Sequence, residues 1–182
     1  MPSMLINFLL FQIGWFACVL GAAYQLPWAG TLSVIAIVAY HLLRAPRPLP
    51  EMKLIAFALL IGFCWDSLLV ASGLLIYQEG MFNEMIAPHW IIAIWALFAS
   101  TLNVSLRWLK GHYLIAALFG MAGGPLAYYA GSELGAVALL DPFLSLLALA
   151  IGWAVMMPLL VFLSGQFDGF GHAARKLEVC DA

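Results

Sequence analysis

The residue least suited to its surroundings is Asp66, which lies near the centre of the apolar stretch from Leu54 to Tyr77. An ionised side chain at the midplane of a bilayer costs at least about 3 kcal/mol. No Lys, Arg or His lies at a comparable depth in any other apolar stretch, so Asp66 has no evident cationic partner. We therefore expect Asp66 to face the interior of a helix bundle. It acts there either as a protonatable group in a pathway or pocket, or as a hydrogen-bonded carboxyl that fixes helix packing.

A second set of polar side chains falls in the apolar stretch that starts at residue 89. Thr101 and Ser105 are four residues apart and share one helix face, while Asn103 lies on an adjacent face. Hydroxyl groups can bond to the preceding helical turn, but an amide in hydrocarbon needs a partner. Gln12, in the first apolar stretch, has the same need. These side chains are expected either to bond neighbouring helices or to contact a substrate.

Glycine and proline interrupt the apolar stretch 113–130. The four-residue spacing of Gly120 and Gly124 predicts close helix packing, and Pro125 removes one backbone hydrogen bond. Two hypotheses follow: a helix break at Gly124 and Pro125 that lines a site, with Tyr128 and Tyr129 on its outer side, or a kinked and tightly packed helix. The candidates for a ligand or proton site are then Asp66, Gln12, Trp15, Trp65, Thr101, Asn103, Ser105 and Tyr128.

No catalytic residue can be assigned from these patterns. The chain has no serine-nucleophile elbow, no phosphate-binding loop and no paired carboxylates. Cys18, Cys64 and Cys180 show no disulfide or zinc spacing, and the four histidines do not offer two haem ligands at a matching depth. No metal and no cofactor is therefore expected.

The amino-acid composition indicates the class of protein to which these residues belong. Of the 182 residues, 65% are apolar and 9% are charged, and the mean hydropathy is +1.04. Soluble domains carry about 25% charged residues. The chain is therefore predicted to be an integral membrane protein. Its few basic residues form no patch that would bind nucleic acid.

Six apolar stretches predict an all-α, polytopic bundle of six transmembrane helices, because each approaches the length that spans a bilayer. Their approximate bounds are 4–24, 26–43, 54–77, 89–106, 113–130 and 143–164. They form one domain, residues 1–164, followed by a short tail, residues 165–182. Between the second and third stretches, three prolines in Arg44–Lys53 predict an extended, basic, aqueous loop.

The distribution of charge predicts the orientation of the bundle. All basic residues fall in alternate connections and the tail, and the opposite connections carry acidic residues only. By the positive-inside rule, both termini are then cytoplasmic. The basic residues are Arg44, Arg47, Lys53, Arg107, Lys110, Arg175 and Lys176, and the acidic ones are Glu79, Glu84, Glu133 and Asp141.

Scattered aromatic, glycine and polar positions resemble those of a proteobacterial family of small multispanning inner-membrane proteins of unknown function. The resemblance covers most of the chain up to about Gly135. The matching positions are Phe11–Val19, Trp65, Asp66, Trp90, Trp95, Thr101, Leu102, Ser105, Trp108, Gly120, Gly124–Leu126, Tyr128 and Gly131. Members of that family tend to be encoded near genes resembling cyclopropane-fatty-acid synthases. The resemblance thus implies a bacterial inner-membrane location and a link to lipid modification, without implying a catalytic residue.

Three functions remain open at this stage. The first is a lipid- or fatty-acyl-binding component of a membrane-lipid modification system, with Asp66 at its centre. The second is a small proton-coupled transporter in which Asp66 titrates. The third is a non-catalytic scaffold that recruits a soluble enzyme through Arg44–Lys53 and the tail. The expected partners are membrane lipids, with a soluble lipid-modifying enzyme and a second copy of the chain as further candidates.

Overall fold

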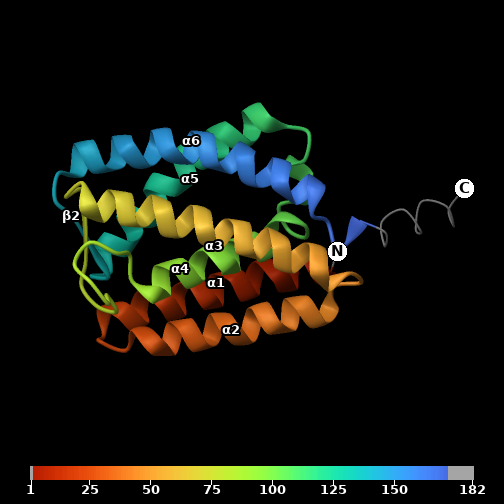
Figure 1. Ribbon diagram of the computed structural model, residues 1–182, viewed down its shortest axis with the longest axis horizontal. Coiled ribbons are helices and arrows are strands. Elements are labelled where there is room, and N and C mark those ends of the chain that lie inside the picture. The colour runs from red at the N-terminus through yellow and green to blue at the C-terminus, as the bar shows by residue number, and fades with distance from the viewer. Residues whose placement is uncertain (1, 172–182) are drawn as a thin grey trace, which may run out of the picture.

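The computed structural model describes residues 2–171 and contains six α-helices, one short 3-10 helix (η1) and two short strands (Figure 1). The elements are α1 (Pro2–Ala23), α2 (Pro27–Arg44), α3 (Pro48–Ala71), β1 (Leu75–Tyr77), α4 (His89–Leu102), η1 (Arg107–Leu109), α5 (Tyr113–Glu133), β2 (Val137–Leu139) and α6 (Pro142–Gln166). The prediction of a helical protein with six helices is confirmed.

Four of the six helices are long and apolar enough to cross a membrane. They are Met4–Ala23 within α1, Pro48–Ala71, Tyr113–Glu133 and Pro142–Gln166. Helix α4 is apolar but has only 14 residues, or about 21 Å at the helical rise per residue, less than the roughly 30 Å hydrocarbon core. The six membrane spans and the side on which the termini lie remain predictions.

The helices lie side by side along the long axis of the molecule (Figure 1). The hairpin of α1 and α2 and the hairpin of α5 and α6 flank the central α4, which packs against α1, α2, α3 and α6. Helix α1 begins and α6 ends at one end of the bundle, near the α2–α3 and α4–α5 connections. We call this the basic end, because Arg44, Arg47, Arg107 and Lys110 belong to it.

The two strands lie at the opposite end and form an antiparallel pair in which Tyr77 faces Val137. Each strand directly follows a helix that ends in a turn with a glycine at positive φ, at Gly73 and Gly135. Glycine adopts this left-handed conformation without steric penalty. The strand pair fixes the position of Tyr77.

Helix α3 differs from the predicted range of 54–77. It begins at Pro48, so the connection between α2 and α3 is much shorter than the extended loop expected over Arg44–Lys53. Pro48 and Pro50 fall in the first helical turn, where backbone N–H groups have no partner within the helix and proline is tolerated. The helix ends at Ala71, and residues 75–77 form β1 instead of a last helical turn.

Helices α4 and α5 also differ from expectation. Helix α4 ends at Leu102 rather than at residue 106, because Asn103 leaves the helix to make contacts described below. Helix α5 continues through Pro125 to Glu133, so the hypothesis of a helix break at Gly124 and Pro125 is not supported. The alternative of close packing agrees with the structure: a Cβ atom on Gly124 would lie 2.3 Å from the Trp153 ring.

Candidate functional site

Asp66 is fully buried inside the bundle and accepts three hydrogen bonds from three different elements. Its Oδ1 atom accepts bonds from the hydroxyl groups of Tyr77 and Tyr128, each at 2.6 Å. Its Oδ2 atom accepts a bond from Nε1 of Trp95 at 2.7 Å. The carboxyl therefore links α3 to β1, α4 and α5. No side-chain nitrogen of Lys, Arg or His is among these donors.

A glycine on α3 allows the Trp95 ring to come close to Asp66. Gly62 and Asp66 are one turn apart on the buried face of α3. A Cβ atom on Gly62 would lie 2.1 Å from Cγ of Trp95, so only glycine admits the indole ring at this place. The ring also stacks on Trp153 of α6, with centroids 4.8 Å apart and planes 11° apart. The indole N–H is thus held in a fixed direction toward the carboxyl.

A cavity of about 420 Å³ lies beside this cluster, and we call it the groove. One wall is a single face of α1, formed by Phe8, Phe11, Gln12, Trp15 and Val19 at helical spacing. The facing wall is α5 between residues 119 and 131, and α4 and α6 close the back. The lining is almost entirely apolar and aromatic.

The groove opens to the lateral surface of the bundle between α1 and α5. Three exposed side chains belong to its lining: Phe8 is 50% exposed, Phe119 44% and Leu126 65%. Small residues on α5 make the space. A Cβ atom on Gly123 would have no other atom within 4 Å, so this glycine borders empty volume.

Asp66 itself does not line the groove, but its three hydrogen-bond donors do. The rings of Tyr77, Trp95 and Tyr128 form part of the wall, and their polar atoms point behind it to Asp66. The carboxyl therefore holds one aromatic wall of the groove in place. Asp66 thus positions the three aromatic rings without facing the groove itself.

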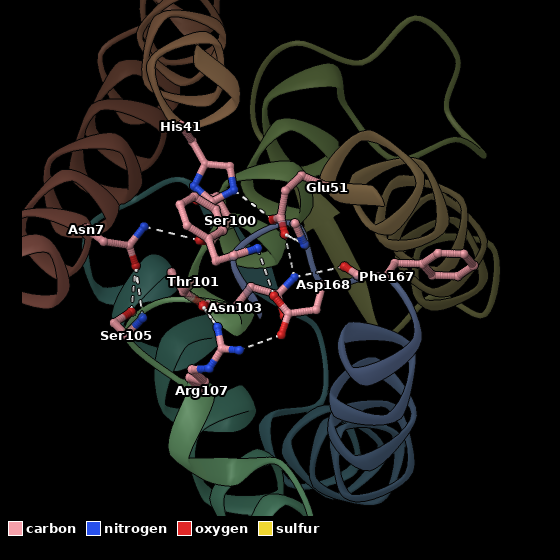
Figure 2. A network of polar contacts seen from close by, with 12 residues as sticks. Asn7, His41, Glu51, Ser100, Thr101, Asn103, Ser105, Arg107, Phe167 and Asp168 are labelled. Carbon is pink, nitrogen blue, oxygen red and sulfur yellow. Dashed lines mark hydrogen bonds and ion pairs between the residues drawn. The ribbon is translucent and has the colours of Figure 1, made fainter. Parts of the chain in front are cut away.

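A second polar network lies at the basic end and is centred on Glu51 of α3 (Figure 2). Glu51 is fully buried. Its Oε1 atom accepts bonds from Asn103 Nδ2 and from the backbone N–H of Gly169, both at 2.7 Å. Its Oε2 atom lies 2.9 Å from Nε2 of His41, which is 5% exposed. A buried carboxylate with this many partners fixes the helix ends around it.

The segment Phe167–Gly171, which follows α6, is held by this network. Asn103 Nδ2 donates to the carbonyl of Phe167 at 2.9 Å, and Arg47 Nη2 donates to the carbonyl of Asp168 at 2.6 Å. The Asp168 carboxylate accepts bonds from Arg107 at 2.6 Å and from Lys110 at 2.8 Å. Figure 2 shows the Arg107 side chain directed at this carboxylate.

The neighbouring positive charges determine the protonation state of the Asp168 side chain. Burial by itself would raise the pKa of Asp168, but the hydrogen bond from Lys110 and the positive charges of Lys110 and Arg107 outweigh it and lower that pKa below its usual value. Burial lowers the pKa of Lys110, and the contact with Asp168 opposes that shift. Asp168 is therefore a carboxylate at neutral pH.

Residues 4–159 match a family described as a protein of unknown function, DUF2878. The chain belongs to this family. No curated protein and no solved structure matches the chain. The resemblance found in the sequence is thereby confirmed as membership of a family of unknown function, while the proteobacterial and inner-membrane scope of that family and its genomic neighbourhood stay predictions.

The region that matches DUF2878 includes the Asp66 cluster and the groove. Most of the predicted site residues meet there: Gln12, Trp15, Thr101, Ser105, Gly124 and Tyr128 line the groove. Four do not line it. Asp66 lies behind the wall, and Pro125 is not part of the lining. Asn103 belongs to the Glu51 network, and Trp65 packs between α3 and α6, where a Cβ atom on Gly152 would lie 2.2 Å from its ring.

Three residues that hold these networks together were not among the predicted site residues. Tyr77 and Trp95 bind the carboxyl of Asp66, and Glu51 organises the basic end. Glu51 lies within the stretch taken for an aqueous loop. One signal for it was present, because His41 and Glu51 flank a short connection and can pair once α3 is extended to Pro48.

Proposed function

We propose that the protein is an integral bacterial inner-membrane protein, with both termini cytoplasmic, that binds the acyl chain of a membrane lipid in the groove. The single observation that supports this function most strongly is the shape and lining of the groove: an apolar cavity of about 420 Å³ that opens sideways. Sites for small molecules are usually apolar with a few polar groups. A sideways opening suits a ligand that enters from the bilayer.

The length of the groove also fits an acyl chain. Its α1 wall runs from Phe8 to Val19, about 17 Å at the helical rise of about 1.5 Å per residue. One leaflet of a bilayer has a hydrocarbon layer of about 15 Å, half the thickness of the core. A single acyl chain lying along α1 would therefore fill the groove over its length.

The few polar groups lie on the side nearer the basic end. Ser105 and Thr101 line the groove there, and the amide of Gln12 faces it from α1. The Ser105 hydroxyl donates to Oδ1 of Asn7 at 2.7 Å, which joins α1 to the turn after α4 (Figure 2). These groups would meet the polar head of the lipid or the ester that connects it to the chain.

The role assigned to Asp66 follows from its three hydrogen bonds. In this proposal it keeps Tyr77, Trp95 and Tyr128 in the groove wall and does not touch the ligand. The observation favours lipid binding over a proton-coupled carrier, because a titrating carrier group would face the pathway. A membrane-lipid modification system, reached through a soluble enzyme at the basic end, is the setting that we propose for this binding.

Gly123→Leu provides a direct test, because its side chain would extend into the groove from a Cβ position that has no other atom within 4 Å. The matched control is Gly165→Leu, at a helical glycine that also has open space around it but lies near the end of α6, outside the groove. We expect wild type and Gly165→Leu to copurify with one lipid per chain, measured by native mass spectrometry. Gly123→Leu should lose this lipid and keep its fold. Equal lipid retention by all three proteins would overturn the proposal.

The link to lipid modification needs a measurement in cells. We expect deletion of the gene to change the fatty-acid profile of the membrane, and Gly165→Leu to restore it at matched protein levels. Gly123→Leu should fail to restore it. An unchanged profile on deletion would leave the binding proposal standing but would remove the proposed link to lipid modification.

A further inference from the structure

Three cationic side chains meet at a single residue at the basic end. Arg107 Nη2 and Lys110 Nζ both donate to Oδ2 of Asp168, at 2.6 and 2.8 Å, and Arg47 Nη2 donates to the carbonyl of the same residue. One carboxylate is thus shared by two cations, with a third nearby. Clustered arginine and lysine side chains with this convergence are typical of sites that bind phosphate.

The Asp168 carboxylate also accepts a hydrogen bond at Oδ1 from the backbone N–H of Phe170, at 2.9 Å, and would give up this bond on leaving. The rest of its segment has other anchors. The backbone around Asp168 is held by bonds that do not involve this side chain: Asn103 Nδ2 to the carbonyl of Phe167, and the N–H of Gly169 to Glu51. A Cβ atom on Gly169 would lie 2.4 Å from the carbonyl oxygen of Arg47, which shows how closely this backbone is enclosed. The side chain of Asp168 is therefore the exchangeable part of the contact.

The cationic cluster adjoins the end of the groove. Leu106 lines the groove and precedes Arg107, and Ser105 lines it from the same turn. Arg107 is 33% exposed and Lys110 is 21% exposed, so both are accessible from the surface. At a membrane surface, basic side chains at this level attract anionic lipid headgroups.

We propose that Arg107 and Lys110 bind the phosphate of an anionic phospholipid whose acyl chain lies in the groove, with the phosphate in the place that the Asp168 carboxylate occupies in this structure. The inference rests on the proposed function and adds the class of headgroup to it. Asp168 then acts as a built-in competitor, which occupies the headgroup position when no lipid is bound. Arg47 remains on the backbone of residue 168 and adds positive charge.

The test compares two lipids with identical acyl chains, phosphatidylglycerol and diacylglycerol, which lacks the phosphate, by native mass spectrometry of the purified full-length protein. We expect wild type to bind phosphatidylglycerol about tenfold more tightly, which is the effect of one charge-assisted hydrogen bond. Substituting both cations (Arg107→Gln with Lys110→Gln) should remove this preference and leave the affinity for diacylglycerol, which has no phosphate, unchanged. Arg44→Gln, a matched control at the basic end, should keep the preference.

A second variant changes affinity in the opposite direction and leaves every cation in place. Asp168→Asn removes the competing charge, so its affinity for phosphatidylglycerol should rise about tenfold, again by the strength of one such bond. If Asp168 is only a structural clamp, this variant will show no gain, and the inference is then wrong.

Inorganic phosphate separates a lipid site from a site for a soluble anion. At millimolar concentration it should not displace phosphatidylglycerol; displacement would overturn the lipid assignment. The outcomes also distinguish the two proposals. Lipid binding that depends on Gly123 but shows no headgroup preference would refute only the present inference. Absence of lipid from the wild-type protein would refute the proposed function itself.

Discussion

Replacing Asp66 by leucine should leave three buried donors without an acceptor. The side chain of leucine is close in size to that of aspartate but accepts no hydrogen bond, so Tyr77, Trp95 and Tyr128 lose their common partner. An unpaired buried donor costs about 1–3 kcal/mol, and hydrogen bonds between membrane helices average about 0.6 kcal/mol. Three such donors place the loss in free energy of unfolding between about 2 and about 9 kcal/mol.

Asp66→Asn should be milder, for a geometric reason. The amide can direct its oxygen to the fixed N–H of Trp95 and its NH₂ group to the two tyrosine oxygens. The hydroxyl hydrogens of Tyr77 and Tyr128 can rotate away, whereas the indole hydrogen cannot. We therefore expect Asn to cost less than half of what Leu costs.

The effect of a tyrosine substitution on the free energy of unfolding should have opposite signs in the wild type and in the Asp66→Leu background. In the wild type, Tyr128→Phe removes a bond to Asp66 and should cost about 1 kcal/mol. In the Asp66→Leu background the same substitution removes an unpaired donor and should stabilise the protein by a similar amount. Tyr77→Phe should behave in the same way, because both hydroxyl groups donate to Oδ1.

These values can be measured by titrating the protein in mixed micelles with sodium dodecyl sulfate and following the fluorescence of its seven tryptophans, which reports unfolding of the bundle. The double-mutant cycle gives the coupling energy directly. Additive effects of Asp66→Leu and Tyr128→Phe would refute the account of Asp66 as the shared acceptor. Tyr129→Phe, at an exposed neighbour on α5, is the control and should be neutral in both backgrounds.

Two further predictions concern the elements around these networks. Gly62→Ala should cost about 1–3 kcal/mol, the usual effect of overpacking, because its Cβ atom would overlap the Trp95 ring; an unchanged midpoint in the same titration would contradict the close packing of α3 and α4. The lowered pKa of Asp168 should stabilise the fold above about pH 4, its usual value, and this stabilisation should be lost as the pH falls through the lower value of the folded protein. The stability difference between wild type and Asp168→Asn should therefore be present at neutral pH and vanish in acid; a constant difference would show that the charge of Asp168 does not stabilise the fold.

The burial of Asp66 could be predicted from the sequence because the argument is local. A carboxyl in the middle of a long apolar stretch has few favourable places, and the bundle interior is one of them. Its partners could not be predicted. Tyr77 lies on a strand that pairs with residues 60 positions away, and such non-local pairing leaves no periodic pattern in the sequence.

At the basic end, the structure predicted from the sequence was wrong for a different reason. Proline spacing predicted an extended loop over Arg44–Lys53, but the same prolines are compatible with a first helical turn. Tertiary contacts decide between the two. Besides His41, Glu51 binds Asn103 and Gly169, which come from distant parts of the chain, and these contacts favour the helix. The Gly124–Pro125 sequence was similarly ambiguous, and packing against Trp153 accompanies the continuous helix.

The central claim is that an acyl chain occupies the groove between α1 and α5. A phospholipid that carries a photoreactive diazirine within its acyl chain tests this most directly, with labelled peptides identified by mass spectrometry. The account predicts labels on the groove faces of α1, at Phe8–Val19, and of α5, at Phe119–Gly131, and their loss in Gly123→Leu but not in Gly165→Leu. Labels spread evenly over the outer faces of α2 and α6, and unchanged in Gly123→Leu, would contradict it.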